Sequence, residues 1–370
     1  MSVPLLDLKA QHATIREEVV AEMMKVVDDQ AFILGAPVAK LECEVAGLSK
    51  TKYAVGCANG TDAILIAMRA LDIGRGDEVV TTPFTFFATA GTIHNVGATP
   101  VFVDVDPKTF NIRPDLAAAA VTSKTKAVIP VDLFGQMAAI EEVRKLLPTM
   151  PIIEDAAQSI GARRKIDGEW RMAGEVATIC TYSFFPSKNL GGYGDGGMIV
   201  TQDETLFKRL SRLRTHGSVQ TYFHEEVGYN SRLDALQAAV LLAKLPHLAG
   251  WSAKRRENAA FYTAAFADIA EITPPFIDPA NESIYNQYTI RVTKRDAFKD
   301  HLKAKGIGHS VYYPLPLHLQ PCFAYLGYKE GSCPESERAA REVVSLPVFP
   351  ELTNAQRDEV VVAVRSFFGK

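Results

Sequence analysis

Short apolar runs alternate with amphipathic segments through the first part of the chain. Seven such runs are candidates for buried strands, at 53–57, 78–82, 100–105, 126–131, 151–154, 177–183 and 197–201. Several connections carry helical patterns, as at 61–71, 87–96 and 138–147, which is how parallel strands are joined across a sheet with helices on both faces. The pattern predicts an α/β domain with a mostly parallel seven-stranded sheet. Ligands of such sheets bind at the carboxyl ends of the strands.

The rest of the chain follows a different pattern. The segment Ser231-Arg-Leu-Asp234 has a capping-box-like signal that opens an apolar helix to about Leu245, and Pro246 closes that helix. The elements expected after it are a charged helix at 251–268, extended runs at 285–293 and 308–313, a helix at 295–305, and a closing helix after Thr353. We therefore expect a large domain at 1–250 and a smaller α+β domain at 251–370.

Composition narrows the function classes. With 370 residues, 47% of them apolar, the chain can build one or two compact domains. A net charge of −3 argues against nucleic acid as the main partner. Five cysteines without a C-x-x-C pair fit reduced thiols, and the N-terminal apolar run is already broken at Asp7. We expect a cytoplasmic protein with no membrane span. The eight histidines have no metal-binding spacing, so we expect no metal site.

One lysine precedes a glycine-rich loop at the end of a predicted strand. Lys188 follows the run at 177–183, and glycines occupy positions 191, 192, 194, 196 and 197. A loop lysine is usually a solvated surface charge, but the glycines leave room for a ligand. Pyridoxal phosphate needs such a lysine for its imine, and the same amine serves as a base once the substrate displaces it.

A carboxylate follows the predicted strand at 151–154. Asp155 alone is equally well explained as a helix cap. A carboxylate beside the cationic ring nitrogen of pyridoxal phosphate would keep that nitrogen protonated. Together, Asp155 and Lys188 favour this cofactor.

The cofactor phosphate requires an anion site. The run at 53–57 leads through Asn59 into Gly60 and Thr61, where a helix begins with free N–H groups and a positive dipole end. A plain helix cap would explain the same residues. Phe86 lies in a loop after a strand, where its ring could stack on the pyridine, although core packing is the default interpretation for a phenylalanine.

The glycine loop also matches a dinucleotide-binding fingerprint, with glycines at 192, 194 and 197. That fingerprint must open a helix in an early βαβ unit, whereas the residues at 198–201 have a strand pattern. The dinucleotide interpretation is therefore rejected.

Taken in order, these motifs resemble the DegT/DnrJ/EryC1/StrS sugar aminotransferases, which have the fold-type I architecture of pyridoxal phosphate enzymes. The resemblance spans nearly the whole chain and rests on several motifs, which are Pro4-Leu-Leu-Asp-Leu8, Phe32-Ile-Leu-Gly35, Asn59-Gly-Thr-Asp-Ala63, Pro83-Phe-Thr-Phe86, Glu154-Asp-Ala-Ala-Gln158, Ser183-Phe-Phe-Pro-Ser-Lys188, Gly228-Tyr-Asn-Ser-Arg-Leu-Asp234 and Tyr313-Pro-Leu-Pro-Leu-His318. Several motifs in the right order are more specific than any one of them.

The resemblance implies a role for each residue around the cofactor. Lys188 would form the imine, Asp155 would bind the ring nitrogen, Gln158 would face the ring hydroxyl, and Phe86 would cover the ring.

The phosphate would be bound by Thr61, beside Gly60, and by Ser183. Asn230 would reach the phosphate of the neighbouring subunit, which implies a homodimer with shared active sites.

The resemblance also implies a reaction. Glutamate would donate an amino group that is passed to a keto group, most simply at the 3-position, of a nucleotide-linked hexose in amino-sugar or lipopolysaccharide O-antigen biosynthesis. Arg232, Tyr312, Tyr313 and His318 are the candidate substrate contacts. Two alternatives stay open. One is a pyridoxal-dependent sugar dehydratase or lyase, although the dehydratases carry histidine at the position of Lys188, and the other is a regulatory protein that binds the cofactor without turnover.

Overall fold

A computed structural model describes residues 2–370. Its helices are α1 (Leu8–Asp29), α2 (Ala36–Leu48), α3 (Gly60–Ala70), α4 (Phe87–Asn95), α5 (Pro114–Ala119), α6 (Ile140–Leu146), α7 (Glu204–Leu213), α8 (Ala235–Lys244), α9 (Leu248–Ala265), α10 (Arg295–Ala304), α11 (Pro334–Glu342) and α12 (Asn354–Phe367), with short 3₁₀ turns η1 (Leu133–Gly135), η2 (Leu245–His247), η3 (Leu317–Leu319) and η4 (Pro321–Leu326). Its strands are β1 (Tyr53–Cys57), β2 (Glu78–Thr81), β3 (Thr99–Phe102), β4 (Thr125–Ile129), β5 (Ile153–Asp155), β6 (Arg163–Ile166), β7 (Glu169–Met172), β8 (Ile179–Ser183), β9 (Gly197–Thr201), β10 (Ser218–Gln220), β11 (Phe223–His224), β12 (Ile272–Thr273), β13 (Asn281–Glu282), β14 (Tyr288–Val292) and β15 (Val343–Leu346).

Two groups of strands join into one central sheet. The strands of one group lie in the order β1-β9-β8-β5 and those of the other in the order β3-β2-β4. Parallel bridges from Val128 to Ile152 and from Val131 to Asp155 connect β4 with β5. Within this sheet only β9 runs antiparallel, against both β1 and β8, while the other pairings are parallel. Each of the seven predicted runs contributes one strand, so the mostly parallel sheet is confirmed.

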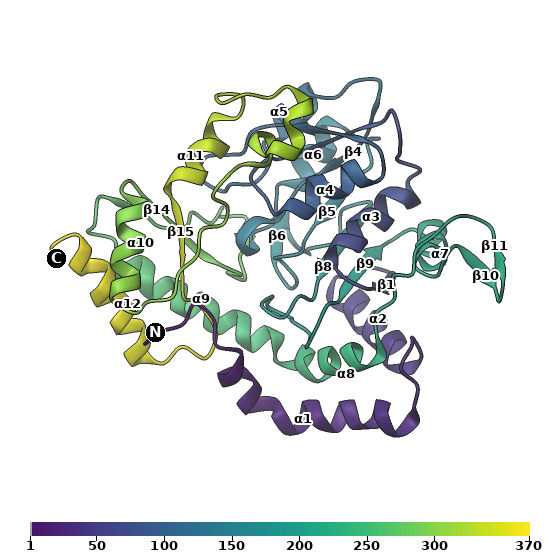
Figure 1. The fold of residues 1–370 in the computed structure, drawn as a ribbon, viewed down its shortest axis with the longest axis horizontal. Coiled ribbons are helices and arrows are strands. Elements are labelled where there is room, and N and C mark those ends of the chain that lie inside the picture. The colour runs from purple at the N-terminus through teal and green to yellow at the C-terminus, as the bar shows by residue number, and fades with distance from the viewer. Residues whose placement is uncertain (1) are drawn as a thin grey trace.

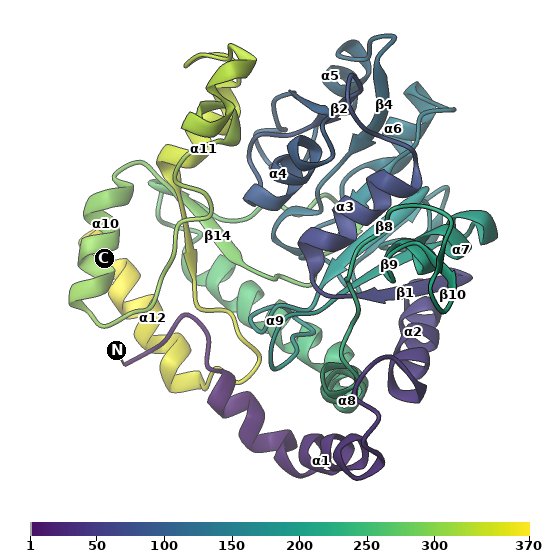
Figure 2. The same cartoon turned by 45° about the vertical axis from the view of Figure 1, so that its right-hand side comes forward.

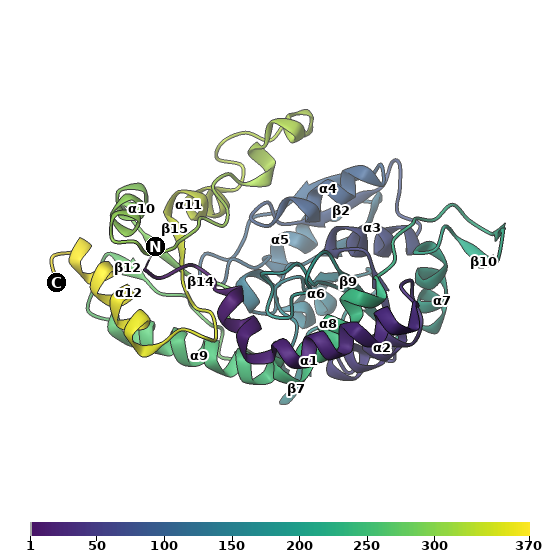
Figure 3. The same cartoon turned by 60° about the horizontal axis from the view of Figure 1, so that its bottom comes forward.

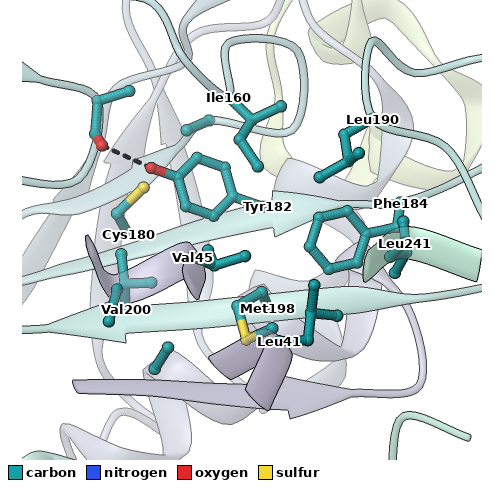
Figure 4. Packing of buried hydrophobic residues seen from close by; sticks show 14 of the residues in the cluster. Leu41, Val45, Ile160, Cys180, Tyr182, Phe184, Leu190, Met198, Val200 and Leu241 are labelled. Atoms are coloured by element: carbon teal, nitrogen blue, oxygen red, sulfur yellow. Dashed lines mark hydrogen bonds between the residues drawn. The ribbon is translucent and has the colours of Figure 1, made fainter. Parts of the chain in front are cut away.

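Helices cover both faces of the sheet because neighbouring strand residues point to opposite sides. Met198 and Val200 of β9 pack with α2 and α8, as Figure 4 shows around Tyr182. Ile199, between them, packs with α3 and α7 on the other face. In Figure 2, α3 and α4 lie on the side of the sheet opposite to α2 and α8. The ends of the strands therefore lie between two layers of helices.

The C-terminal part builds a second core around the antiparallel sheet β12-β14-β15, which α9, α10 and α12 cover (Figure 1). The N-terminal residue Val3 belongs to this core and forms a parallel bridge with Ile307. The division of the chain near residue 250 is our proposal, and α9 lies across it.

Two local predictions were wrong. The run at 308–313 forms no strand, because Gly308 packs against the backbone of Leu5 and only isolated bridges at Ile307 and Ser310 remain. Ser231 does not cap a helix. Its hydroxyl accepts the Ala58 N–H at 3.2 Å, and α8 begins only after Asp234.

A two-stranded hairpin, β10 with β11, projects beyond α7 at the edge of the large part (Figure 3). Its exposed side chains include Tyr222 and Phe223, which are 91% and 61% exposed. From Ser2 onward, no helix combines the length and the apolar content that crossing a membrane would require.

Candidate active site

Lys188 lies in a tight turn directly after β8. Its N–H donates to the carbonyl of Phe185 at 2.9 Å, and a Cβ added to Gly191 would lie 2.3 Å from the carbonyl oxygen of Pro186. The turn therefore needs glycine there. Burial lowers the pKa of Lys188 to about 8, against an opposing effect of the Asp155 charge. A substantial fraction of this amine is neutral near pH 8 and can act as a nucleophile.

Asp155 ends β5, which pairs in parallel with β8, so its carboxyl group faces the same opening as Lys188. The Thr89 hydroxyl of α4 donates to one carboxyl oxygen at 2.7 Å, and the Ala157 N–H donates to the other at 3.3 Å. Burial raises the pKa of Asp155, although both hydrogen bonds and the Lys188 charge oppose that effect. A cationic ring nitrogen placed here would favour the ionised carboxylate.

Gln158 and two aromatic side chains form the next part of the site. The Gln158 carbonyl oxygen accepts the Phe134 N–H at 2.7 Å, and its amide group donates to the Tyr313 hydroxyl at 3.1 Å. The Tyr313 ring lies 6.5 Å from the ring of Phe86, which is 57% exposed at the start of α4. The structure therefore brings together residues that the sequence assigned to the ring and to the substrate.

A glycine corner lies beside these groups. Asn59 caps α3 by accepting the Asp62 N–H at 2.8 Å, while the first N–H groups of a helix, here those of Gly60 and Thr61, have no intrahelical acceptor. A Cβ on Gly60 would lie 2.6 Å from the Cβ of Ser183. The helix start and the end of β8 therefore approach closely only because residue 60 is glycine. N–H groups and two hydroxyls gather here, which suits a phosphate.

The other predicted residues lie in different surroundings. Asn230 is exposed at the base of the hairpin, and Arg232 is half-buried two residues further along. Tyr312 lines a small cavity of about 100 Å³ together with Ser187, the neighbour of Lys188. His318 is 1% exposed and pairs with Glu337 at 3.1 Å. A direct substrate contact by His318 stays a prediction, and the hydrogen bond with Glu337 accounts for its burial.

Two residues that support the site were missed by the sequence interpretation. Thr89 holds Asp155, and Lys244 of α8 donates to the carbonyl of Gly191 at 2.6 Å. Lys244 is 2% exposed, and burial lowers its pKa to about 8. The available signal was a lysine that is the only charged residue of the mostly apolar segment 235–245, because a buried lysine needs a specific partner.

Cavity size does not locate this site. A cavity of about 800 Å³ lies between α2, α8 and α9 and is lined by Cys43, Leu48 and Ser252, but by none of the predicted site residues. Across residues 2–370, no group of three His, Cys, Asp or Glu side chains is arranged to hold a metal ion.

The residues present fit pyridoxal phosphate. The Lys188 amine is partly neutral and can react with the aldehyde. The Asp155 carboxylate is buried without a full counter-ion and can pair with the ring nitrogen. The glycine corner at the start of α3 can receive the phosphate. The fold and these groups define an enzyme of the fold-type I pyridoxal phosphate class.

The chain belongs to the DegT/DnrJ/EryC1/StrS aminotransferase family, whose pattern matches residues 13–365. It is a pyridoxal phosphate-dependent sugar aminotransferase. A protein of Geobacillus stearothermophilus named "Pleiotropic regulatory protein" is 51% identical, over 100% of this chain and 99% of its own length. The UDP-N-acetyl-3-dehydro-alpha-D-glucosamine 3-aminotransferase of Acidithiobacillus ferrooxidans is 44% identical, over 98% and 97%. The crystal structure of S. venezuelae DesV in complex with a ketimine intermediate has a TM-score of 0.96 and 40% identity, with 100% and 99% of the chains covered.

Proposed function

We propose that this protein transfers an amino group from glutamate to the 3-keto group of a nucleotide-linked hexose, within amino-sugar or lipopolysaccharide O-antigen biosynthesis. The observation that carries the proposal is the arrangement of Lys188 and Asp155 at adjacent strand ends. The 3-position is supported by the name of the Acidithiobacillus relative, which is similar over nearly its whole length. Glutamate is proposed from the resemblance stated above.

Each residue has a defined task in this proposal. The bound cofactor supplies an electrophilic aldehyde and an electron-accepting ring. Lys188 holds the cofactor and, once displaced by the amino donor, moves a proton between the substrate and cofactor carbons, since its pKa near 8 lets it both accept and release a proton. Asp155 keeps the ring nitrogen protonated, and Gln158 orients the ring through its amide.

The phosphate and the substrate have separate contacts. Gly60, Thr61 and Ser183 bind the phosphate at the start of α3. Arg232 and Tyr312 are proposed to contact the sugar diphosphate, as the resemblance implies.

The active site is proposed to be completed by a second copy of the chain. Phe86 and Phe185 are 57% and 52% exposed at the opening, and Tyr222 and Phe223 project from the hairpin. Exposed aromatic side chains of this kind mark contact surfaces. In an isologous dimer, Asn230 of one chain would reach the phosphate held by the other.

A half reaction tests the proposal. Glutamate alone should convert the bound cofactor to its amine form and release one equivalent of 2-oxoglutarate per site, because transamination proceeds in two separable stages. The amine form should then convert a 3-keto nucleotide hexose, but not its 4-keto isomer, to a product one amino group heavier by mass spectrometry. Lys188→Ala is the control.

The result separates this function from its rivals. A lyase would release product without an amino donor, and a sensor would bind the cofactor without converting it with any amino acid. Conversion of the 4-keto isomer in place of the 3-keto isomer would contradict the assigned position and leave transamination intact.

A further inference from the structure

Two buried carboxyl groups meet behind the proposed cofactor site. Asp132 follows β4, and Glu154 is the residue of β5 that directly precedes Asp155. Both side chains are 0% exposed, and the two carboxyl groups lie close enough for each to affect the pKa of the other. Alternation along the strand directs Glu154 to the face opposite to Asp155. Neither carboxyl group has a task in the reaction described above.

Two carboxyl groups in contact inside a dry core cannot both be ionised, so one of them holds a proton. Asp132 accepts the Ala138 N–H at 2.8 Å on one oxygen and the Ser159 hydroxyl at 2.7 Å on the other. Glu154 accepts the Gly174 N–H at 2.8 Å and, outside the pair, is otherwise approached only by the Cys180 thiol, a weak donor, while its Oε1 has no donor among the described residues. A carboxylate prefers the site with more donors, so the geometry leaves the proton on Oε1 of Glu154.

The pair is attached to the segment that carries the cofactor contacts. The backbone N–H of Asp132 donates to the carbonyl of Asp155 at 3.0 Å. Ser159, whose hydroxyl donates to Asp132, directly follows Gln158. Asp132 therefore holds both ends of the turn at 155–159, on which Asp155 and Gln158 lie.

We propose that Asp132 and Glu154 form a one-proton carboxyl pair, with the proton on Glu154, and that this pair positions the turn at 155–159 so that Asp155 and Gln158 contact the cofactor ring. Both are positioning residues that act through Ser159 and the backbone. The second half of the inference rests on the proposed cofactor roles of Asp155 and Gln158. The location of the proton on Glu154 does not depend on those roles.

The titratable groups around the pair are Cys180 and Tyr182 on β8 and, on the other face of β5, Asp155, whose charge acts on Asp132; none of them is cationic. Burial raises the pKa of Glu154 well above its usual value and that of Asp132 to about 6. A carboxyl group whose pKa is raised by folding keeps its proton where the unfolded chain has lost it. Stability therefore falls as pH rises above the ordinary pKa of glutamate.

The first experiment replaces Glu154 by glutamine, which retains the shape and donates the same hydrogen bond with no proton to lose. Between pH 5 and pH 8, the Tm of the wild type should fall relative to that of Glu154→Gln by about 2 °C or more. Glu142→Gln, on the exposed side of α6, is the control and should follow the wild type. Asp132→Asn should lower the Tm more than Glu154→Gln. A larger loss of Tm in Glu154→Gln than in Asp132→Asn, or parallel curves of Tm against pH for wild type and Glu154→Gln, would show that the proton is not on Glu154.

The second experiment cuts the link to the turn. Ser159→Ala removes the hydroxyl that donates to Asp132. The change should raise the Kd for pyridoxal phosphate, measured by equilibrium dialysis, about five-fold or more. Ser252→Ala is the control, because Ser252 is also buried and its hydroxyl has no partner among the described residues. An unchanged Kd in Ser159→Ala would reduce the pair to a purely structural role. Neither readout depends on sugar turnover, so a failed sugar assignment leaves both interpretable.

Discussion

Thr89→Val gives a sharp test of how Asp155 is held. The change keeps the branched shape of a fully buried side chain and removes only the hydroxyl that donates to Asp155 at 2.7 Å. A hydrogen bond to a charged group contributes about 1.5–3 kcal/mol. Removing the donor costs most of this free energy when the acceptor stays buried. Because the hydrogen bond opposes the effect of burial, its loss should raise the pKa of Asp155 further.

The expected consequence is a weaker hold on the protonated ring nitrogen. The loss of about 1.5–3 kcal/mol corresponds to roughly a 10- to 150-fold lower rate constant for the glutamate half reaction. The Thr85 hydroxyl lies 3.1 Å from that of Thr89 and can turn toward Asp155 in the variant. The fall in the rate constant should then lie near the lower end of this range. The acidic limb of the pH–rate profile should shift to higher pH, because the Asp155 carboxyl group then keeps its proton over a wider range.

Thr92→Val is the matched control. Thr92 lies on the same helix and is equally buried, but its hydroxyl donates to the backbone carbonyls of Ala88 at 2.8 Å and Thr89 at 3.2 Å and makes no direct hydrogen bond to Asp155. Stopped-flow absorbance of the half reaction, recorded across pH for both variants, measures the effect. If Thr89→Val and Thr92→Val were equally active with the same pH limbs, the hydrogen bond to Asp155 would have no part in catalysis.

Three further changes address the remaining parts of the site. Lys188→Ala should abolish borohydride-reducible attachment of the cofactor, and retained attachment would assign the imine to another lysine. Gly60→Ala should weaken phosphate binding and raise the Kd for pyridoxal phosphate, since its Cβ would lie 2.6 Å from Ser183, whereas Gly47→Ala has open space and should be neutral or stabilising by about 0.5–1 kcal/mol. Heterodimers of a Lys188→Ala chain with an Asn230→Ala chain should regain up to half of wild-type activity per dimer, because one shared site is then intact, and isolated heterodimers without recovery would contradict the shared site.

The central sheet was predictable because its strands are buried on both faces and appear as continuous apolar runs. The run at 308–313 is less apolar and pairs with β15 only through the isolated bridge from Ser310 to Ser345, since Gly308 is held against the N-terminal residues. Ser231 shows the same limit. Its capping pattern is local, but its hydroxyl is taken by Ala58, a residue far away in the sequence. Local patterns could not reveal these tertiary partners.

The site shows a similar division. The proximity of Lys188 and Asp155 was predictable because Asp155 ends one recognisable strand and Lys188 lies in the loop after another, and strand ends meet at one edge of a sheet. Tyr313 and His318 lie in one motif, yet Tyr313 is hydrogen-bonded to Gln158 while His318 is hydrogen-bonded to Glu337. The four residues between them form no regular helix or strand before the short turn η3, and no periodicity determines where the two side chains point.

The charges of the site are balanced by what it binds. Burial holds the pKa of Lys188 near 8, below its usual 10.5, and raises that of Asp155. In the cofactor-free chain, the amine therefore opposes folding at neutral pH, and this effect fades as pH rises from about 8 toward 10.5, where the unfolded amine also loses its proton. The carboxyl group opposes folding at every pH above its ordinary range. Attachment of the cofactor to Lys188 and a cationic ring nitrogen beside Asp155 would remove both effects together. Binding should therefore raise the Tm most at neutral pH and less near pH 10, and a gain that did not depend on pH would mean that these two groups are not the ones that the cofactor relieves.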